Sequence, residues 1–135
     1  MSDDDEFTYD DAVVAERMAA DRMEERRTLE ERASFALLAE EWKKSVQLAS
    51  LDKKSPLEGT AKLTEEVGEL MREVLILSGA HGTTYRASSH AARVEELADV
   101  LLCAFALQHK LNVSNYELVE ALRIKRAKWK SKVDG

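Results

Sequence analysis

The chain has 135 residues, with 26 acidic and 20 basic side chains, a formal net charge of −6 and a single proline. This length suits one domain with a real core, and so few helix breakers favour an all-α protein. The lone Cys103 excludes an internal disulfide and is typical of a reducing compartment. The acidic start is unlike a signal peptide, and the longest apolar run is too short to span a membrane. We therefore expect a cytoplasmic protein with no membrane partner.

The negative charge is concentrated near the N-terminus. Residues 1–31 carry 12 acidic and 4 basic side chains, whereas residues 32–135 carry 14 acidic and 16 basic ones. Residues 1–8 combine high charge with few apolar side chains, which indicates disorder. We therefore predict an acidic extension over residues 1–30, partly disordered or helical, and a folded domain over residues 31–135.

The first half of the chain is helical, but its helix boundaries are ambiguous. A helix from about Asp10 to Arg27 has only a thin apolar face. Thr28 and Glu31 have the spacing of a capping box, which predicts the start of a second helix running to about Ser50. The pattern is also compatible with one long helix.

The remaining chain divides into three helices, expected at about 56–78, 88–112 and 115–132. Two of them open with capping boxes, "SPLE" at 55–58 and "SNYE" at 114–117. Gly79 is typical of a helix C-terminus, and Ser88 or Ser89 is expected to cap the third helix. Helices of this length joined by short loops predict an up-and-down four-helix bundle or a closely related packing.

Two acidic motifs with the same three-residue spacing lie on neighbouring helices. Glu66 and Glu69 form a stripe beside the apolar face of the helix at 56–78. From Leu97 to Leu107 every residue except Asp99 is apolar, so we expect this helix to be buried on most sides, with Asp99 inside the bundle. Asp99 shares one stripe of the helix with Glu96, Cys103 and Ala106, and we expect that stripe to face something polar. If the two helices are antiparallel, Glu66 lies opposite Asp99 and Glu69 lies opposite Glu96.

Four carboxylates that meet in one groove repel one another unless cations neutralise them. Oxygen-only ligands favour a hard ion, so we expect Mg²⁺, and Mn²⁺ also fits. Because Mg²⁺ keeps ligand positions for water and phosphates, such a site suggests phosphate chemistry. The alternative is that Lys62, Arg72 or Arg93 neutralises the acids in ordinary salt bridges.

Residues 123–132 carry six basic side chains and no acidic one. This run is either a solvated helix end that complements the helix dipole or a site for anionic phosphate. Nucleic-acid binding is a poor third explanation, because the run has no aromatic residue besides Trp129 and the whole chain is acidic.

The motifs together resemble one known superfamily. "KLTEEVGEL", then "EELADVLL", then a lysine-rich last helix is similar to the MazG-like all-α nucleoside triphosphate pyrophosphohydrolases. The family pattern is EExxE, a variable gap and ExxD, which the sequence matches at Glu65-Glu66-x-x-Glu69 and Glu96-x-x-Asp99. The resemblance covers roughly residues 34–130 and leaves the acidic extension without a counterpart.

The resemblance implies a MazG-type four-helix fold assembled across the chains of a homodimer or homotetramer. It implies Mg²⁺-dependent hydrolysis of an NTP or dNTP to the monophosphate and pyrophosphate. The implied metal ligands are Glu66, Glu69, Glu96 and Asp99. Glu65 or Glu69 would accept the proton of the attacking water, and Lys125 and Lys128 would bind the phosphates. Trp42 or Phe35 is a candidate for stacking the base, although either residue also suits the core.

Two departures from the family pattern leave the base unidentified. Cys103 stands where relatives specific for cytosine nucleotides often carry an aromatic residue, and Trp129 stands where the family's last helix often has asparagine. The alternative function on the same fold is a non-catalytic nucleotide-binding or interaction protein. All four acidic positions of the family pattern are present, which argues against a relative that has lost catalytic activity.

Overall fold

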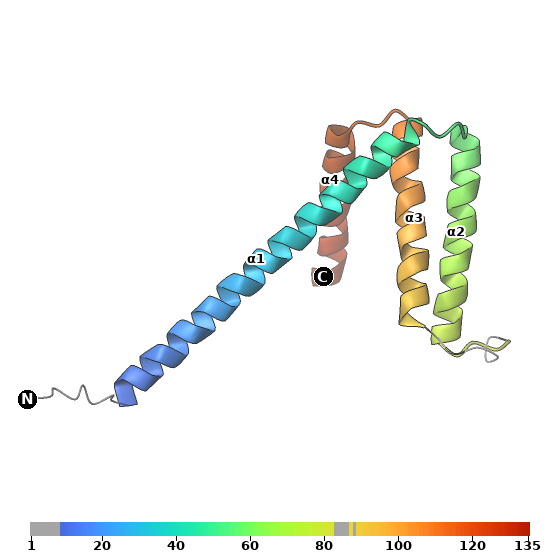
Figure 1. Ribbon diagram of the computed structural model, residues 1–135. Coiled ribbons are helices and arrows are strands. Elements are labelled where there is room, and N and C mark those ends of the chain that lie inside the picture. The colour runs from blue at the N-terminus through green and yellow to red at the C-terminus, as the bar shows by residue number, and fades with distance from the viewer. Residues whose placement is uncertain (1–8, 83–86, 88) are drawn as a thin grey trace, which may run out of the picture. The chain divides into compact units, whose positions relative to one another are not determined.

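A computed structural model describes residues 9–82, 87 and 89–135 of the chain. All regular structure in these ranges is α-helical (Figure 1). The four helices are α1 (Tyr9–Ala49), α2 (Pro56–Leu77), α3 (His90–Lys110) and α4 (Asn115–Asp134). The all-α prediction is therefore confirmed. The expected disorder of residues 1–8 and the possible cap at Ser88 lie outside the described residues.

Of the two arrangements compatible with the first half of the chain, the structure contains the single long helix. The expected cap at Thr28 is wrong, because its hydroxyl donates a hydrogen bond to the carbonyl of Glu24 at 3.0 Å, one turn back. Glu31 lies 3.5 Å from Arg27 in an ion pair on the helix surface. Both side chains therefore contact the preceding turn of one continuous helix, and neither marks a helix end. A threonine inside a helix commonly makes such a hydrogen bond to the backbone of the preceding turn.

The chain divides into two compact units at a point inside α1. One unit runs up to Glu41, and the other runs from Trp42 to Gly135. The second unit contains the end of α1 together with α2, α3 and α4, and it holds both acidic motifs. The domain boundary expected near residue 30 stays a prediction. None of the described helices is both long enough and apolar enough to cross a bilayer.

The helix ends follow the signals in the sequence closely. Both expected capping boxes form, Ser55 with Glu58 and Ser114 with Glu117. Ser89 caps α3 by accepting a hydrogen bond from the backbone N–H of Ala92 at 3.2 Å. Gly79 and Asn112 follow the last turns of α2 and α3 with φ of 69° and 55°, the left-handed conformation that glycine and asparagine tolerate.

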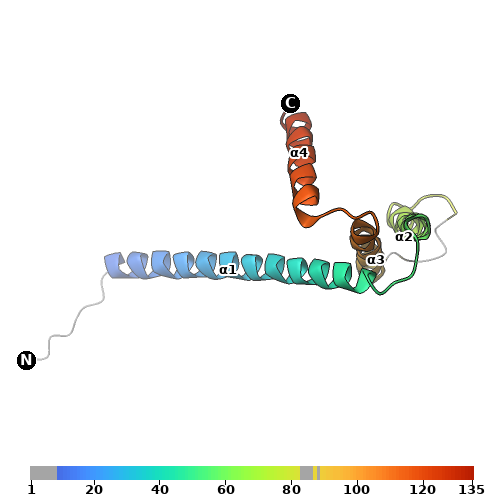
Figure 2. The ribbon, with the colours of Figure 1, turned by 90° about the horizontal axis from the view of Figure 1, so that it is seen from above.

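Helices α2 and α3 lie side by side and antiparallel (Figures 1 and 2). Among the described helices they are the only pair whose backbones pack along their length. Gly59 permits a close approach near one end, because a Cβ atom there would lie 3.2 Å from Cδ2 of Leu107. The two helices therefore form a hairpin that fixes the relative heights of the two acidic motifs.

The apolar surface of this hairpin is covered only in part. The buried apolar residues of the described chain are Ala49, Ile76 and Leu107, and each of them keeps a small exposed surface. The expectation that α3 is buried on most sides is not met within one chain, since Leu97, Leu101 and Leu102 are all about half exposed. The physical reason is that α2 packs against one side of α3. The four-helix bundle itself stays a prediction.

Candidate metal centre

The hairpin brings one residue of α2 and two of α3 into a single acidic cluster. One carboxylate oxygen from each of Glu66, Glu96 and Asp99 lies within 4.8 Å of the others. The antiparallel packing accounts for this contact, because residues three apart share a helix face and the facing motifs stand at matching heights. The predicted convergence of the two motifs across one groove is therefore confirmed for these three residues.

The three carboxylates differ in their exposure to solvent. Glu66 is buried, with 6% of its surface accessible, and Glu96 is intermediate. Asp99 is exposed, so the expectation that it lies inside the bundle is wrong for the single chain. The cluster is consequently buried at Glu66 on α2 and open to solvent at Asp99 on α3. A ligand could therefore enter it from solvent.

The surroundings of Glu96 disfavour its ionised form. Burial raises the pKa of its carboxyl group, and the neighbouring carboxylate of Glu69 raises that pKa further. Among the described residues, its Oε2 atom has no hydrogen-bond partner although it is buried. Glu69, the fourth expected ligand, thus lies beside Glu96. A side-chain hydrogen bond with Glu69 also raises this pKa. Such a bond needs one of the two groups to be protonated, so when both are ionised a cation would relieve their repulsion.

Lys62 neutralises part of the cluster from one turn away on α2. Its Nζ atom lies 2.6 Å from Oε1 of Glu66 and 3.2 Å from Oε1 of Glu65. Hydrogen bonds to Glu66 and then to Glu65 raise the pKa of Lys62 above its usual value. The salt-bridge alternative is therefore realised for these two glutamates. Glu65 is exposed and points its carboxylate to Lys62, so it is not a member of the three-residue cluster.

A pocket of about 280 Å³ opens beside the cluster. Its lining residues are Asp52, Lys54, Gly59, Lys62, Glu66, Asp99, Leu102, Cys103, Ala106 and Lys110. Of the stripe predicted on α3, Asp99, Cys103 and Ala106 line this pocket together with charged side chains, whereas Glu96 does not. Burial raises the pKa of the Cys103 thiol, which suits a small packing residue in the pocket wall.

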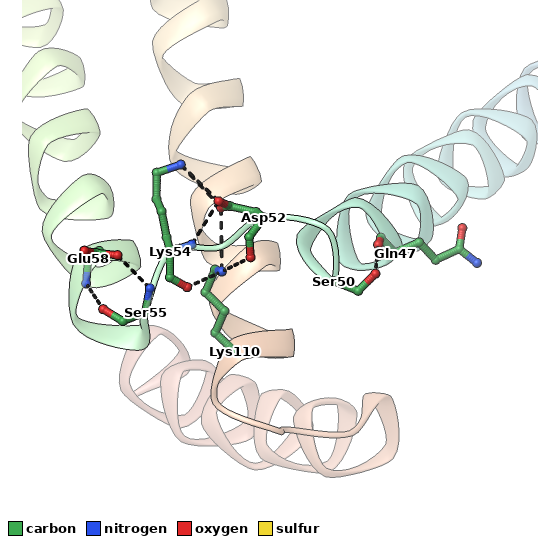
Figure 3. Close-up of polar contacts among 7 residues, drawn as sticks. All are labelled: Gln47, Ser50, Asp52, Lys54, Ser55, Glu58 and Lys110. Atoms are coloured by element: carbon green, nitrogen blue, oxygen red, sulfur yellow. Dashed lines mark hydrogen bonds and ion pairs between the residues drawn. The ribbon is translucent and has the colours of Figure 1, made fainter.

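The connection between α1 and α2 is held against the end of α3 by Lys110 (Figure 3). Its ammonium group donates hydrogen bonds to the carbonyl oxygens of Asp52 at 3.0 Å and Lys54 at 2.6 Å. Only 6% of the Lys110 side chain is exposed. The sequence does not indicate this contact, since a lysine in the last turn of a helix is ordinarily solvated and complements the helix dipole.

Trp42 contributes to packing in the second unit. Its ring stacks on Phe105 with centroids 5.7 Å apart, and its indole N–H donates to Oε1 of Gln108 at 2.7 Å. Gln108 in turn donates to Oδ1 of Asn115 at 2.6 Å. The predicted core alternative for Trp42 thus has direct support, and Trp42 is not among the residues that line the pocket at the carboxylates. Phe35, the other stacking candidate, is exposed.

Lys125 and Lys128 lie on α4, and both are exposed. Neither lines the pocket at the carboxylates. Lys125 belongs to a separate surface of α4, whose other members are Val119, Leu122, Arg123, Arg126 and Trp129. The structure therefore brings together the acidic motifs but not the basic residues assigned to the phosphates.

The cluster offers carboxylate oxygen and no nitrogen or sulfur ligand within its three residues. Such a donor set favours hard divalent cations over zinc or copper. Comparisons of the chain with protein-family models, with characterised proteins and with solved structures find no match. The interpretation of this site therefore rests on its geometry and on the motif pattern.

Proposed function

We propose that this protein is a Mg²⁺-dependent nucleoside triphosphate pyrophosphohydrolase of the MazG-like kind. It would hydrolyse an NTP or dNTP to the monophosphate and pyrophosphate, as a house-cleaning enzyme of the nucleotide pool. The observation that carries the proposal is the convergence of Glu66, Glu96 and Asp99 to within 4.8 Å. The EExxE and ExxD motifs, which supply these residues, support the specific reaction.

The residues present fit a hard divalent cation. Glu66, Glu96 and Asp99 would hold it, with Glu69 completing the set beside Glu96. The buried Oε2 atom of Glu96, which lacks a partner among the described residues, is the kind of group that a bound cation satisfies. We propose Mg²⁺ as the physiological ion, and Mn²⁺ is expected to substitute for it.

The reaction that we propose divides between the cation and the chain's own residues. A divalent cation held here would neutralise phosphate charge and favour attack of water on the α-phosphorus. We propose that Glu69 accepts the proton of that water, and its position beside Glu96 supports this role. Glu65, the other candidate, is occupied by Lys62. The P–O bond to the β-phosphate would break, and pyrophosphate would leave.

The substrate is expected to meet residues outside the carboxylate cluster as well. We propose that Lys125 and Lys128 of α4 bind the phosphates as point charges. The pocket beside Glu66 and Asp99 has room for part of a nucleotide. Trp42 is a weaker candidate for stacking the base, because its indole N–H already donates to Gln108 and its ring already stacks on Phe105.

We propose that the protein is a homodimer or homotetramer. Only three apolar residues are buried among the described residues, whereas α2 and α3 expose many apolar side chains. Those residues are Leu57, Val67, Met71, Val74, Leu75, Leu77, Val94, Leu97, Leu101 and Leu102. A second copy could cover these surfaces and complete a four-helix bundle. Light scattering should give a mass above the 15.2 kDa of one chain.

The deciding experiment measures pyrophosphate release from the common NTPs and dNTPs in the presence of Mg²⁺. Glu66→Gln and Asp99→Asn should abolish release, because each removes a proposed ligand without changing side-chain size. Glu95→Gln is the matched control, since Glu95 is exposed on α3 and outside the cluster. Binding of a triphosphate by calorimetry without turnover would support the alternative, a nucleotide-binding protein.

A further inference from the structure

Glu66 belongs to the proposed metal site and also forms an ion pair with a lysine. It is the buried member of the carboxylate cluster, and it also holds the ammonium group of Lys62 at 2.6 Å. Lys62 lies one turn earlier on α2 and lines the same pocket as Asp99. The ammonium group therefore already occupies a carboxylate oxygen of Glu66, a residue that a cation in this cluster would need as a ligand.

A lysine in this position competes with a metal ion. A divalent cation bound by Glu66 would lie only a few ångströms from the ammonium group, and like charges at such a separation repel. Lys62 can move away, because its side chain is 42% exposed and rests on a flexible four-carbon stem. Glu65 offers it a second partner at 3.2 Å, on the exposed side of the helix.

We propose that Lys62 is a built-in counter-cation that a divalent metal ion must displace from Glu66, and that Glu65 then retains it. In this role Lys62 sets the metal concentration at which the site fills, and it keeps the carboxylates neutralised when no metal is bound. The inference rests on the proposed metal site, but it concerns regulation of that site and not the reaction.

The competing explanation is that Lys62 only stabilises α2 through ordinary pairs three and four residues away. Helical pairs of this spacing contribute little to stability. The two explanations differ in one measurable quantity, the affinity of the protein for a divalent cation in the absence of nucleotide.

Calorimetric titration of the full chain with Mg²⁺ and with Mn²⁺ tests the inference. Lys62→Met should bind either ion more tightly than the wild type, by roughly threefold to tenfold, as expected for loss of one partly exposed competing charge. Lys62→Gln is a second neutral variant, and Lys62→Arg should stay near the wild type because it keeps the charge. Lys43→Met, which removes an exposed positive charge from α1, should leave the affinity unchanged.

The outcomes separate this inference from the proposed function. Equal or weaker binding by both Lys62→Met and Lys62→Gln, with hydrolysis by the wild type, would overturn the inference alone. Tighter binding by these variants, without hydrolysis of any triphosphate by the wild type, would support the inference and overturn the proposed function. Failure of the wild-type protein to bind either ion would overturn both.

Discussion

The indole N–H of Trp42 donates a hydrogen bond to the side-chain carbonyl of Gln108 at 2.7 Å, and the side-chain amide N–H of Gln108 donates one to Oδ1 of Asn115. The amide of Gln108 is 6% exposed and is satisfied on both sides. One buried polar side chain of α3 therefore connects the end of α1 with the first residue of α4. This connection explains why a glutamine is accepted next to the buried Leu107.

Replacing Gln108 with leucine should destabilise the protein by about 1–2 kcal/mol, because the N–H of Trp42 loses its acceptor in a half-buried position. Urea unfolding followed by tryptophan fluorescence measures the loss, at one protein concentration so that assembly does not shift the midpoint. Gln47→Leu makes the same replacement at an exposed position of α1 and should change little. Coincident unfolding curves for the two variants would show that the hydrogen bond is dispensable.

Lys110 should be required for the conformation of the α1–α2 connection. Lys110→Met preserves most of the side-chain volume but removes the donor to the carbonyls of Asp52 and Lys54, so we expect a loss of about 1.5 kcal/mol. Amide hydrogen exchange should show faster opening of residues 50–55 in this variant. Lys53→Met is the control within the same connection, since Lys53 is exposed. Unchanged exchange in the Lys110 variant would contradict a clamping role.

The same connection should make stability depend on acid pH. The hydrogen bond from the backbone N–H of Lys54 holds the pKa of Asp52 below its usual 3.8, although burial opposes this effect. The ammonium groups of Lys54 and Lys110 lower the pKa further by smaller amounts. A carboxyl group whose pKa is lower in the folded state stabilises it above that usual value, and the contribution is lost as pH falls below it. Asp52→Asn should therefore be less stable than the wild type at pH 6, with the difference narrowing towards pH 3. A constant difference in unfolding free energy across this range would refute the electrostatic origin.

Local signals in the sequence predicted the helix ends well. The capping boxes at Ser55 and Ser114 and the stop at Gly79 each depend on a few neighbouring residues, and all three form. Thr28 shows the limit of such signals. A threonine hydroxyl can cap a following helix or bond back to the preceding turn, and only the helical context on both sides decides between them.

The sequence predicted which acidic residues face each other, but not how exposed to solvent they are. The positions of Glu66 and Asp99 relative to the helix ends determined that they would face each other. The solvent exposure of Asp99 depends on which other helices or chains cover the hairpin, and that information is not local. The clamp at Lys110 is missed for the same reason, since its partners lie more than 50 residues away in the sequence.

Glu96 should be a residue that the protein retains at a cost in stability. Its carboxyl group lies beside Glu69, and its buried Oε2 atom has no partner among the described residues, so Glu96→Gln removes a repulsive charge at nearly constant volume. With a chelator present, this variant should unfold a few degrees above the wild type, because the repulsion from Glu69 is removed. Mg²⁺ should raise the melting temperature of the wild type, because the ion binds the folded state, but should raise that of Glu96→Gln much less. Glu95→Gln, one residue earlier and exposed, should keep the full response to Mg²⁺. A Glu96→Gln protein that is less stable than the wild type under chelation would mean that Glu96 has a structural partner and is not poised for a cation.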